Sequence, residues 1–599
     1  MIDFIKQIFA SAIGFVLVFV LLFFFGFILV VVTSSDPEPT VRDNSVLYVK
    51  VSGTVPERLS QDPFEELFGS RSKAGPSLEN FEQNLKKAAV DERIEGVLME
   101  IDFVSTPWPV LQHMRRAMQE FREDSGKFIY ATTNDVGFNE QGYYLATAAD
   151  SVYGQPASLM QMTGFSVSQS FLEGALSKAG IEAEVVRRGD YKSAGDGFKR
   201  QDYSEADREQ LRAIYEDIVD EFETAVAERT GMSRPELSEM LNQPPRLDIA
   251  YYAERGLLDR IVYMDDLKEQ IKEEIGVNAD SDLRLLANGS YAQVSARNAG
   301  LPSPPRESVA VIYASGAIMP NMDDGGLPFG QDNTINIDNV RASLDRALSD
   351  NNVKAIVLRI NSPGGAASTS DAIWNMLREA SEQKPVIASM AGVAASGGYY
   401  IGMGADEIMA ERTTITGSIG VIGIQINAQE LLEEKLGVQY DEIKFHDNAN
   451  WLNPSRPMTP AQRQAFEQFI DLSYEDFLER VAESRDMSVE EVHEVAQGRV
   501  WSGADALEIG LVDAVGGLDD AIALAAERAG LEEYGVRRLP RPQTFVEQLL
   551  GAGQVRVASL FGPSVKVPHQ QELEMVHYLL TEQKRPQAWA VMPQLIEMK

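Results

Sequence analysis

The feature that most constrains the fold of this chain is an internal repeat whose two copies lie almost half a chain apart. Residues 141–150 read QGYYLATAAD and residues 397–406 read GGYYIGMGAD, at an offset of 256 residues. Upstream of these blocks, residues 94–101 (IEGVLMEI) correspond to residues 353–360 (VKAIVLRI) in the same order. A chain that repeats in this way is expected to fold as two related units.

Each copy of the repeat has the pattern of an α/β unit. The copies open with similar apolar runs, residues 45–53 and 308–316, which predict the first strand of each sheet. Strand-like runs then alternate with amphipathic stretches such as residues 339–349 and 460–484, as is typical of α/β folds. We therefore predict an α/β fold made of two tandem domains. The predicted divisions are an anchor at 1–35, a first repeat at 36–297, a proline-containing linker at 298–306, a second repeat at 307–540 and an extension at 541–599.

An uninterrupted apolar stretch at residues 8–32 precedes the first repeat. It contains no charged residue and is long enough to cross a bilayer as a tilted helix. A cleaved signal peptide would have a shorter apolar region followed by small residues, whereas this stretch runs into Val32 and Thr33. We predict a retained single-pass anchor with Lys6 on the inner side and the bulk of the chain outside.

Composition argues against several classes of function. The chain has 54 lysines and arginines against 90 aspartates and glutamates, and its net charge of −36 predicts no nucleic-acid partner. There is no cysteine, and the five histidines show no metal-ligand spacing, so no metal site is expected. Phosphate-cradling and dinucleotide-binding glycine motifs are also missing from the sequence, so we predict no cofactor.

The second repeat contains a serine surrounded by small residues. Ser396 lies in residues 391–399 (AGVAASGGY), directly after a strand-like run. Small neighbours permit close approach of a substrate, and the amide of Gly397 could stabilise an oxyanion. A second glycine pair, Gly364 and Gly365, follows another strand-like run, and either glycine could supply the other amide. Taken alone, tight packing and an ordinary turn explain these motifs equally well.

The two repeats differ from each other in a complementary way. Ser396 corresponds to Glu140 in the first repeat, whereas Lys192 of the first repeat aligns with Asp447 and Asn448 of the second. Each repeat therefore lacks what the other has. This pattern favours one composite site, in which Lys192 removes the proton of Ser396.

A lysine acts as a base only in its neutral form. Burial and distance from carboxylates lower the pKa of a lysine enough for that role. Because Asp190 and Asp196 stand on either side of Lys192, we expect their side chains to point elsewhere.

Four blocks of sequence give the chain a resemblance to a known family. They are residues 191–194 (YKSA), 361–365 (NSPGG), 394–398 (AASGG) and 416–420 (TGSIG). With these blocks in this order, the chain resembles, nearly end to end, the signal peptide peptidase A family in its long, tandem-repeat, membrane-anchored form, also called protease IV. The resemblance implies two domains of the Clp protease and crotonase-like α/β fold, a lysine base at Lys192 and a serine nucleophile at Ser396.

The resemblance also implies further roles and partners. Ser418 is expected to orient the lysine, and Gly365 and Gly397 are the expected oxyanion donors. The family likeness implies a homotetramer at the outer, periplasmic face of the inner membrane. Its expected substrates are signal-peptide remnants, which are apolar and largely unfolded peptides.

Two other functions remain open from the sequence. A crotonase-like acyl-CoA enzyme would use the two glycine motifs to hold a thioester enolate, because one fold can host several reactions. An acidic, membrane-tethered scaffold would bind peptides without cleaving them. Retention of a covalent serine inhibitor would exclude the acyl-CoA enzyme, and turnover of a casein-like substrate would exclude the scaffold.

Overall fold

The computed structural model describes residues 38–58, 75–134, 136–321, 334–540 and 588–592, together with Gly14 and Val18. Apart from Gly14 and Val18, the predicted anchor at 8–32 lies outside the described residues. Within the described ranges, no helix combines the length and apolar character that crossing a bilayer requires.

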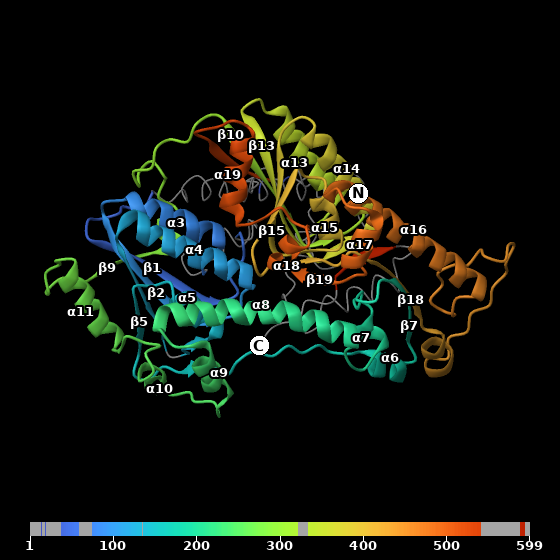
Figure 1. Ribbon diagram of the computed structural model, residues 1–599, viewed down its shortest axis with the longest axis horizontal. Helices are drawn as coiled ribbons and strands as arrows, with labels where there is room; N and C mark the ends of the chain where they lie inside the picture. The colour runs from blue at the N-terminus through green and yellow to red at the C-terminus, as the bar shows by residue number, and fades with distance from the viewer. Residues whose placement is uncertain are drawn as a thin grey trace, which may run out of the picture.

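The first repeat is built around a six-stranded parallel sheet with the order β8-β5-β3-β2-β1-β9 (Figure 1). The strands predicted at 45–53 and 94–101 are confirmed as β1 and β2. Their side chains are mostly buried on both faces, which explains why they read as apolar runs without alternation. The strands are β1 Ser45–Gly53, β2 Ile94–Val104, β3 Phe128–Thr132, β5 Ser151–Gly154, β8 Arg260–Ile261 and β9 Arg284–Ala287.

The second repeat reproduces this sheet strand by strand. Its order β20-β16-β15-β13-β10-β21 matches the order of the first sheet, and all of these pairs are parallel. The internal repeat predicted from the sequence is therefore confirmed, and two further strands, β17 and β19, extend the second sheet beside β15. The strands are β10 Ser308–Ser315, β13 Val353–Ser362, β15 Val386–Ala395, β16 Glu407–Ala410, β17 Ile415–Gly417, β19 Val500–Ser502, β20 Ala514–Val515 and β21 Gly535–Leu539.

A third sheet joins segments from the two repeats, with the order β12-β11-β14-β22-β18-β7. Its longest pairing is antiparallel, between β7 of the first repeat and β18 of the second. This pairing holds the segment that follows β7 against the second repeat. The strands are β7 Glu182–Arg188, β11 Ala317–Ile318, β12 Thr334–Ile335, β14 Gly364–Ala366, β18 Val421–Asn427 and β22 Trp589–Val591, and β4 Phe138–Asn139 pairs with β6 Met160–Gln161 in a separate two-stranded sheet.

Two 26-residue helices, α8 (Glu205–Thr230) and α16 (Pro460–Arg485), are the longest described. Ser204 caps the start of α8, and Thr459 forms a capping box with Gln462 before α16. In Figure 1, α8 runs along the molecule from the first sheet toward β7 and β18. The remaining helices are α3 Leu78–Val90, α4 Trp108–Ser125, α5 Glu140–Ala146, α6 Glu173–Ala179, α7 Asp196–Lys199, α9 Arg234–Asn242, α10 Ile249–Ala253, α11 Met264–Glu274, α12 Asn288–Tyr291, α13 Ile337–Ser349, α14 Ala367–Ser381, α15 Gly397–Gly402, the π-helical turn η2 Leu431–Lys435, α17 Val489–Val495, α18 Gly503–Glu508 and α19 Leu518–Arg528.

Buried contacts also join the repeats outside the third sheet. The guanidinium of Arg359 in β13 is almost fully buried and pairs with Glu57 at 2.7 Å. Arg116 in α4 pairs with Glu411, which follows β16, also at 2.7 Å. Breaking one partner of such a buried pair is costly, so these contacts hold the two repeats in one arrangement.

Candidate active site

Ser396 lies where β15 ends and α15 begins. Its backbone has a φ of 56°, a left-handed conformation that is uncommon for a residue other than glycine. The Ser396 N–H donates to the carbonyl of Gly417 at 2.7 Å, which holds the turn against β17. The following residues must be small, because a Cβ on Gly398 would lie 2.6 Å from the carbonyl oxygen of Ser362.

Lys192 reaches this serine from the first repeat. Its Nζ lies 2.7 Å from Ser396 Oγ, 2.7 Å from the carbonyl oxygen of Ser418 and 3.0 Å from Ser418 Oγ. These three oxygens give the amine three hydrogen-bonding partners. The structure therefore brings together Lys192, Ser396 and Ser418, which the sequence analysis had grouped.

The segment that carries Lys192 is held on both sides. The Tyr191 N–H donates to the carbonyl of Gln497 at 2.9 Å, and the Gln210 side chain of α8 donates to the Tyr191 carbonyl at 3.1 Å. Gly498, with a φ of 79°, passes so close that a Cβ there would lie 2.5 Å from the Cβ of Lys192. These contacts leave the lysine little freedom, which suits a group that must keep one geometry.

Lys192 is fully buried, and this burial lowers its pKa well below the usual value of a lysine. Within the described residues, no carboxylate lies within ion-pair distance of its amine. Asp190 is exposed to solvent, and Asp196 instead pairs with Arg187 at 2.9 Å. The two acidic neighbours therefore point away from the amine, as the hypothesis of a neutral lysine requires.

The glycines expected to stabilise an oxyanion also converge on the site. A Cβ on Gly397 would lie 3.0 Å from the amide nitrogen of Gly365 and 3.1 Å from the carbonyl oxygen of Ala590. The amide of Gly364, in contrast, donates to the hydroxyl of Ser362 at 3.1 Å. This arrangement favours Gly365, the expected donor, over Gly364, because the Gly365 amide lies beside Gly397.

The corresponding position of the first repeat is closed. Glu140, which aligns with Ser396, is the first residue of α5, and its carboxylate accepts hydrogen bonds from the amides of Thr163 at 2.5 Å and Gly164 at 2.9 Å. In the first repeat, these two amide N–H groups are therefore already hydrogen-bonded to a carboxylate, at the position where the second repeat has a serine.

Sequence reasoning missed one part of this site. The strand β22 lies next to Gly365, although the sequence offered no reason to place residues 588–592 there. The apolar clusters of the extension, residues 545–550 and 575–580, predict a packed or partner-binding segment, and they lie outside the described residues.

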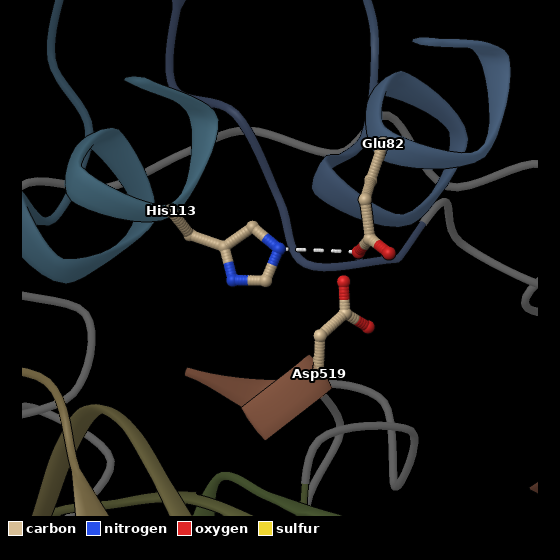
Figure 2. A group of neighbouring side chains, drawn as sticks. All are labelled: Glu82, His113 and Asp519. Atoms are coloured by element: carbon tan, nitrogen blue, oxygen red, sulfur yellow. Dashed lines mark hydrogen bonds and ion pairs between the residues drawn. The ribbon is translucent and has the colours of Figure 1, made fainter. Parts of the chain in front are cut away.

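A second group of titratable side chains lies where α3 and α4 face α19. Figure 2 shows Glu82, His113 and Asp519 pointing toward one another, with His113 Nε2 at 3.1 Å from Glu82 Oε2. The ammonium of Lys86 lies 2.5 Å from Glu82 and 2.6 Å from Asp519. Because the ammonium of Lys86 already pairs with both carboxylates, we interpret this cluster as an ion-pair network between the repeats.

Comparison with known proteins identifies the family. The model of peptidase family S49 matches residues 122–278 and 378–532, one match in each repeat. The chloroplastic serine protease SPPA of Arabidopsis thaliana is 36% identical over 522 residues, which cover 86% of this chain and 74% of that protein. Protease 4 of Salmonella typhi is 30% identical over 87% of this chain and 84% of its own length. A putative signal peptide peptidase SppA of Enterococcus faecium is 36% identical over 31% of this chain and 54% of its own length.

The matches extend over both repeats, and the Arabidopsis and Salmonella relatives, each matched over most of this chain, are proteases. They favour proteolysis over the acyl-CoA chemistry and the inactive scaffold that the sequence had left open. The chain therefore belongs to peptidase family S49 and is a serine protease with two copies of the family's domain.

Proposed function

We propose that this protein is a serine endopeptidase in which Ser396 is the nucleophile and Lys192 is the general base. The observation that carries the proposal is the 2.7 Å distance between Lys192 Nζ and Ser396 Oγ, at an amine whose pKa burial has lowered. A serine hydroxyl becomes an effective nucleophile when a neutral base lies within hydrogen-bonding distance.

In the acylation step, Ser396 Oγ attacks the carbonyl carbon of the scissile peptide bond while Lys192 Nζ takes the hydroxyl proton. The carbonyl electrons move onto the oxygen, where the amides of Gly365 and Gly397 stabilise the negative charge. The tetrahedral intermediate collapses when the carbon–nitrogen bond breaks, and the Lys192 ammonium gives its proton to the departing nitrogen. Lys192 then deprotonates a water molecule that hydrolyses the acyl ester and restores the serine.

Ser418 acts in this proposal as a positioning residue. Its carbonyl and its hydroxyl both contact the amine, at 2.7 and 3.0 Å, and so direct the third position of Nζ toward Ser396. The hydroxyl accepts a hydrogen bond from Nζ both in the ammonium and in the neutral amine, so the contact persists through the proton transfer and the lone pair of the neutral amine stays free for the Ser396 proton.

The substrates we propose are cleaved signal peptides and other apolar, unfolded peptides. Support comes from the name of the Enterococcus relative and from the resemblance to the signal peptide peptidase A family. We further propose that residues 8–32 anchor the chain in the inner membrane by a single span, with both domains on the periplasmic side. The domains, at 36–297 and 307–540, would have the Clp protease and crotonase-like fold and assemble as a homotetramer.

The decisive experiment compares Ser396→Ala with a matched control, Ser343→Ala. Both serines are buried, but the Ser343 hydroxyl only donates to the Asn339 carbonyl within α13. With casein or an apolar peptide as substrate, we expect Ser396→Ala to lose at least about 10⁴-fold in kcat/KM and Ser343→Ala to keep the parent value. Unaltered turnover by Ser396→Ala would overturn the assignment of the nucleophile.

The membrane and assembly proposals have separate tests. Membranes from expressing cells, washed with alkaline carbonate, should retain the full-length chain and release a chain that starts at residue 36. Sedimentation of the detergent-solubilised full-length chain and of the chain that starts at residue 36 should give a mass of about four chains. A monomer in both samples would contradict the tetramer.

A further inference from the structure

The strand β22 lies between two strands of the candidate active site. It pairs antiparallel with β14, where Ala590 faces Gly365, and antiparallel with β18, where Trp589 faces Ile422. It therefore lies between β14 and β18 and pairs with the backbone N–H and C=O groups that each of these strands has on that side.

The register of β22 directs one carbonyl group toward the proposed oxyanion donors. The Ala367 N–H donates to the Ala588 carbonyl at 3.0 Å, and the Met592 N–H donates to the Pro363 carbonyl at 2.8 Å. Because hydrogen-bonded pairs recur at every second residue of an antiparallel ladder, the intervening pair of Gly365 and Ala590 is also a hydrogen-bonded pair.

The carbonyl oxygen of Ala590 is close to both proposed donors. A Cβ on Gly364 would lie 2.0 Å from this oxygen and 2.8 Å from the amide nitrogen of Gly397, and a Cβ on Gly397 would lie 3.1 Å from the same oxygen. In a bound substrate, the carbonyl held by the oxyanion donors is the one that the nucleophile attacks. Ala590 thus occupies the position of the residue before a scissile bond, beside Ser396.

The side chains of β22 are also closely packed against the rest of the protein. Ala588, Trp589, Ala590 and Met592 are all buried, and Trp589 packs in a cluster with residues of β7 and β18. Addition of an extended peptide to exposed strand edges is a common mode of peptide recognition, with affinity from the backbone and selectivity from alternate side chains. Here a segment of the chain itself uses that mode.

We propose that residues 588–592 act as an intramolecular pseudosubstrate, which competes with peptide substrates for the space between β14 and β18. This inference rests on the proposed function, because it takes Ser396, Gly365 and Gly397 as the reacting centre. A tethered strand has an effective concentration on the order of millimolar, so a substrate binds only in the fraction of molecules from which the strand has left. The enclosed Ala590 side chain further indicates that this position accepts a small residue.

The first test measures binding without catalysis, in the Ser396→Ala background. The probe is a fluorescent, end-blocked peptide with the sequence of residues 588–592, AWAVM, and its affinity is compared between the full-length variant and the same variant ending at Gln587. If the strand is docked nine-tenths of the time, the full-length chain binds about tenfold more weakly. Equal affinity for the two chains would overturn the proposal.

A second pair of variants keeps the chain length unchanged, in case the shortened chain does not fold. Ala590→Glu places a charge at a fully buried position and should expel the strand, so the probe should bind about as well as it does to the shortened chain. Val591→Glu is the matched control, because that neighbouring side chain is only partly buried and alternates to the other face. If Ala590→Glu binds no better than Val591→Glu, the proposal fails.

A displacement experiment separates a pseudosubstrate from a purely structural strand. An unlabelled casein-derived peptide that the parent enzyme cleaves should displace the probe competitively from the shortened Ser396→Ala chain. Failure to displace it would make β22 a structural strand and overturn the inference. Since the first two measurements require no turnover, a failure of this inference is distinguishable from a failure of the Ser396 assignment.

Discussion

Lys192 Nζ and Ser396 Oγ lie 2.7 Å apart, although 204 positions separate the two residues along the chain. The antiparallel pairing of β7 with β18 is what closes this distance, because it fixes the segment after β7 against the second repeat. The proposed catalytic centre therefore needs both repeats, because the proposed base lies in the first repeat and the proposed nucleophile lies in the second.

Replacing the lysine by methionine should remove the base and leave the fold intact. Methionine fills a similar apolar volume, so we expect Lys192→Met to lower kcat/KM by roughly 10³-fold or more, through kcat rather than KM. Lys199→Met is the matched control, because Lys199 is exposed on α7 and should keep the parent activity. Activity retained in Lys192→Met would show that another group takes the proton.

The same variant should be more stable than the parent at neutral pH. Burial lowers the pKa of Lys192 in the folded state, so below the ordinary lysine pKa the unfolded chain binds more protons than the folded one. The cost of keeping the lysine buried is therefore largest at low pH and disappears as the pH approaches about 10.5. Denaturant unfolding at several pH values should show a stability gain for Lys192→Met that shrinks as the pH rises.

The pH dependence of kcat/KM should reflect the same group. The amine must be neutral to accept the proton, so activity should fall as the pH drops through the folded-state pKa of Lys192 and rise to a plateau above it. Because burial lowers that pKa, the rising limb should lie well below the pH at which ordinary lysines titrate. A limb centred near 10.5 would contradict a desolvated base.

Ser418 should affect the rate more than substrate binding. Ser418→Ala removes the 3.0 Å contact with the amine but keeps the carbonyl contact, and loss of one such hydrogen bond should lower kcat about 10- to 100-fold with little change in KM. Ser418→Gly is the informative partner variant, because the backbone φ of 52° at this position suits glycine. Similar losses in both variants would assign the effect to the hydroxyl, and recovery in Ser418→Gly would assign it to the backbone.

The composite site was predictable from the sequence because the evidence for it was local in each repeat. Glu140 stands at the position of Ser396, and the residues aligned with Lys192 include no lysine, so comparison of the two copies predicted which residues act together. The role of Ser418 came only from family resemblance, since its own carbonyl and hydroxyl become partners of Nζ only in three dimensions.

The third sheet could not be predicted in the same way. β11 and β12 contain two residues each and β14 contains three, which is too short for alternating hydrophobicity to be recognised. β22 is separated from its partner β14 by more than 200 residues, and its pairing depends on backbone groups that every sequence has. The surroundings of the Lys192 amine likewise depended on side-chain orientation, because Asp196 turns toward Arg187.

Gly397→Ala should test the oxyanion donors. The added Cβ would lie 2.7 Å from Ser370 Oγ and 3.0 Å from the Gly365 amide nitrogen. Both distances are shorter than an ordinary van der Waals contact, so the proposed donors should shift and kcat/KM should fall roughly 10²-fold. Adding Ser370→Ala removes the nearest clash and should recover part of the loss. Gly174→Ala is the control, because a Cβ there meets no atom within 4 Å and should leave activity unchanged. A double variant with no recovery would place the cause at the Gly365 amide rather than at Ser370.

The ion-pair network between the repeats should make stability depend on acid pH. Burial opposes the ionisation of Glu82, but its hydrogen bond with His113 and the charge of Lys86 outweigh this and hold its pKa below the usual range. A carboxyl with a lowered folded-state pKa stabilises the protein fully above its unfolded pKa of about 4.5 and loses that effect as the pH falls further. We expect Glu82→Gln to lower the free energy of unfolding at pH 7 by about 1.5 to 3 kcal/mol, because the variant loses the ion pair with Lys86 and the charged acceptor of the His113 hydrogen bond, while Lys86 still pairs with Asp519. The difference from the parent should narrow by about 1.4 kcal/mol per pH unit below about 4.5. Urea unfolding of Glu82→Gln and of an exposed control, Glu123→Gln, measures both effects, and a difference that stays constant down to about pH 3 would assign the loss to packing rather than to charge.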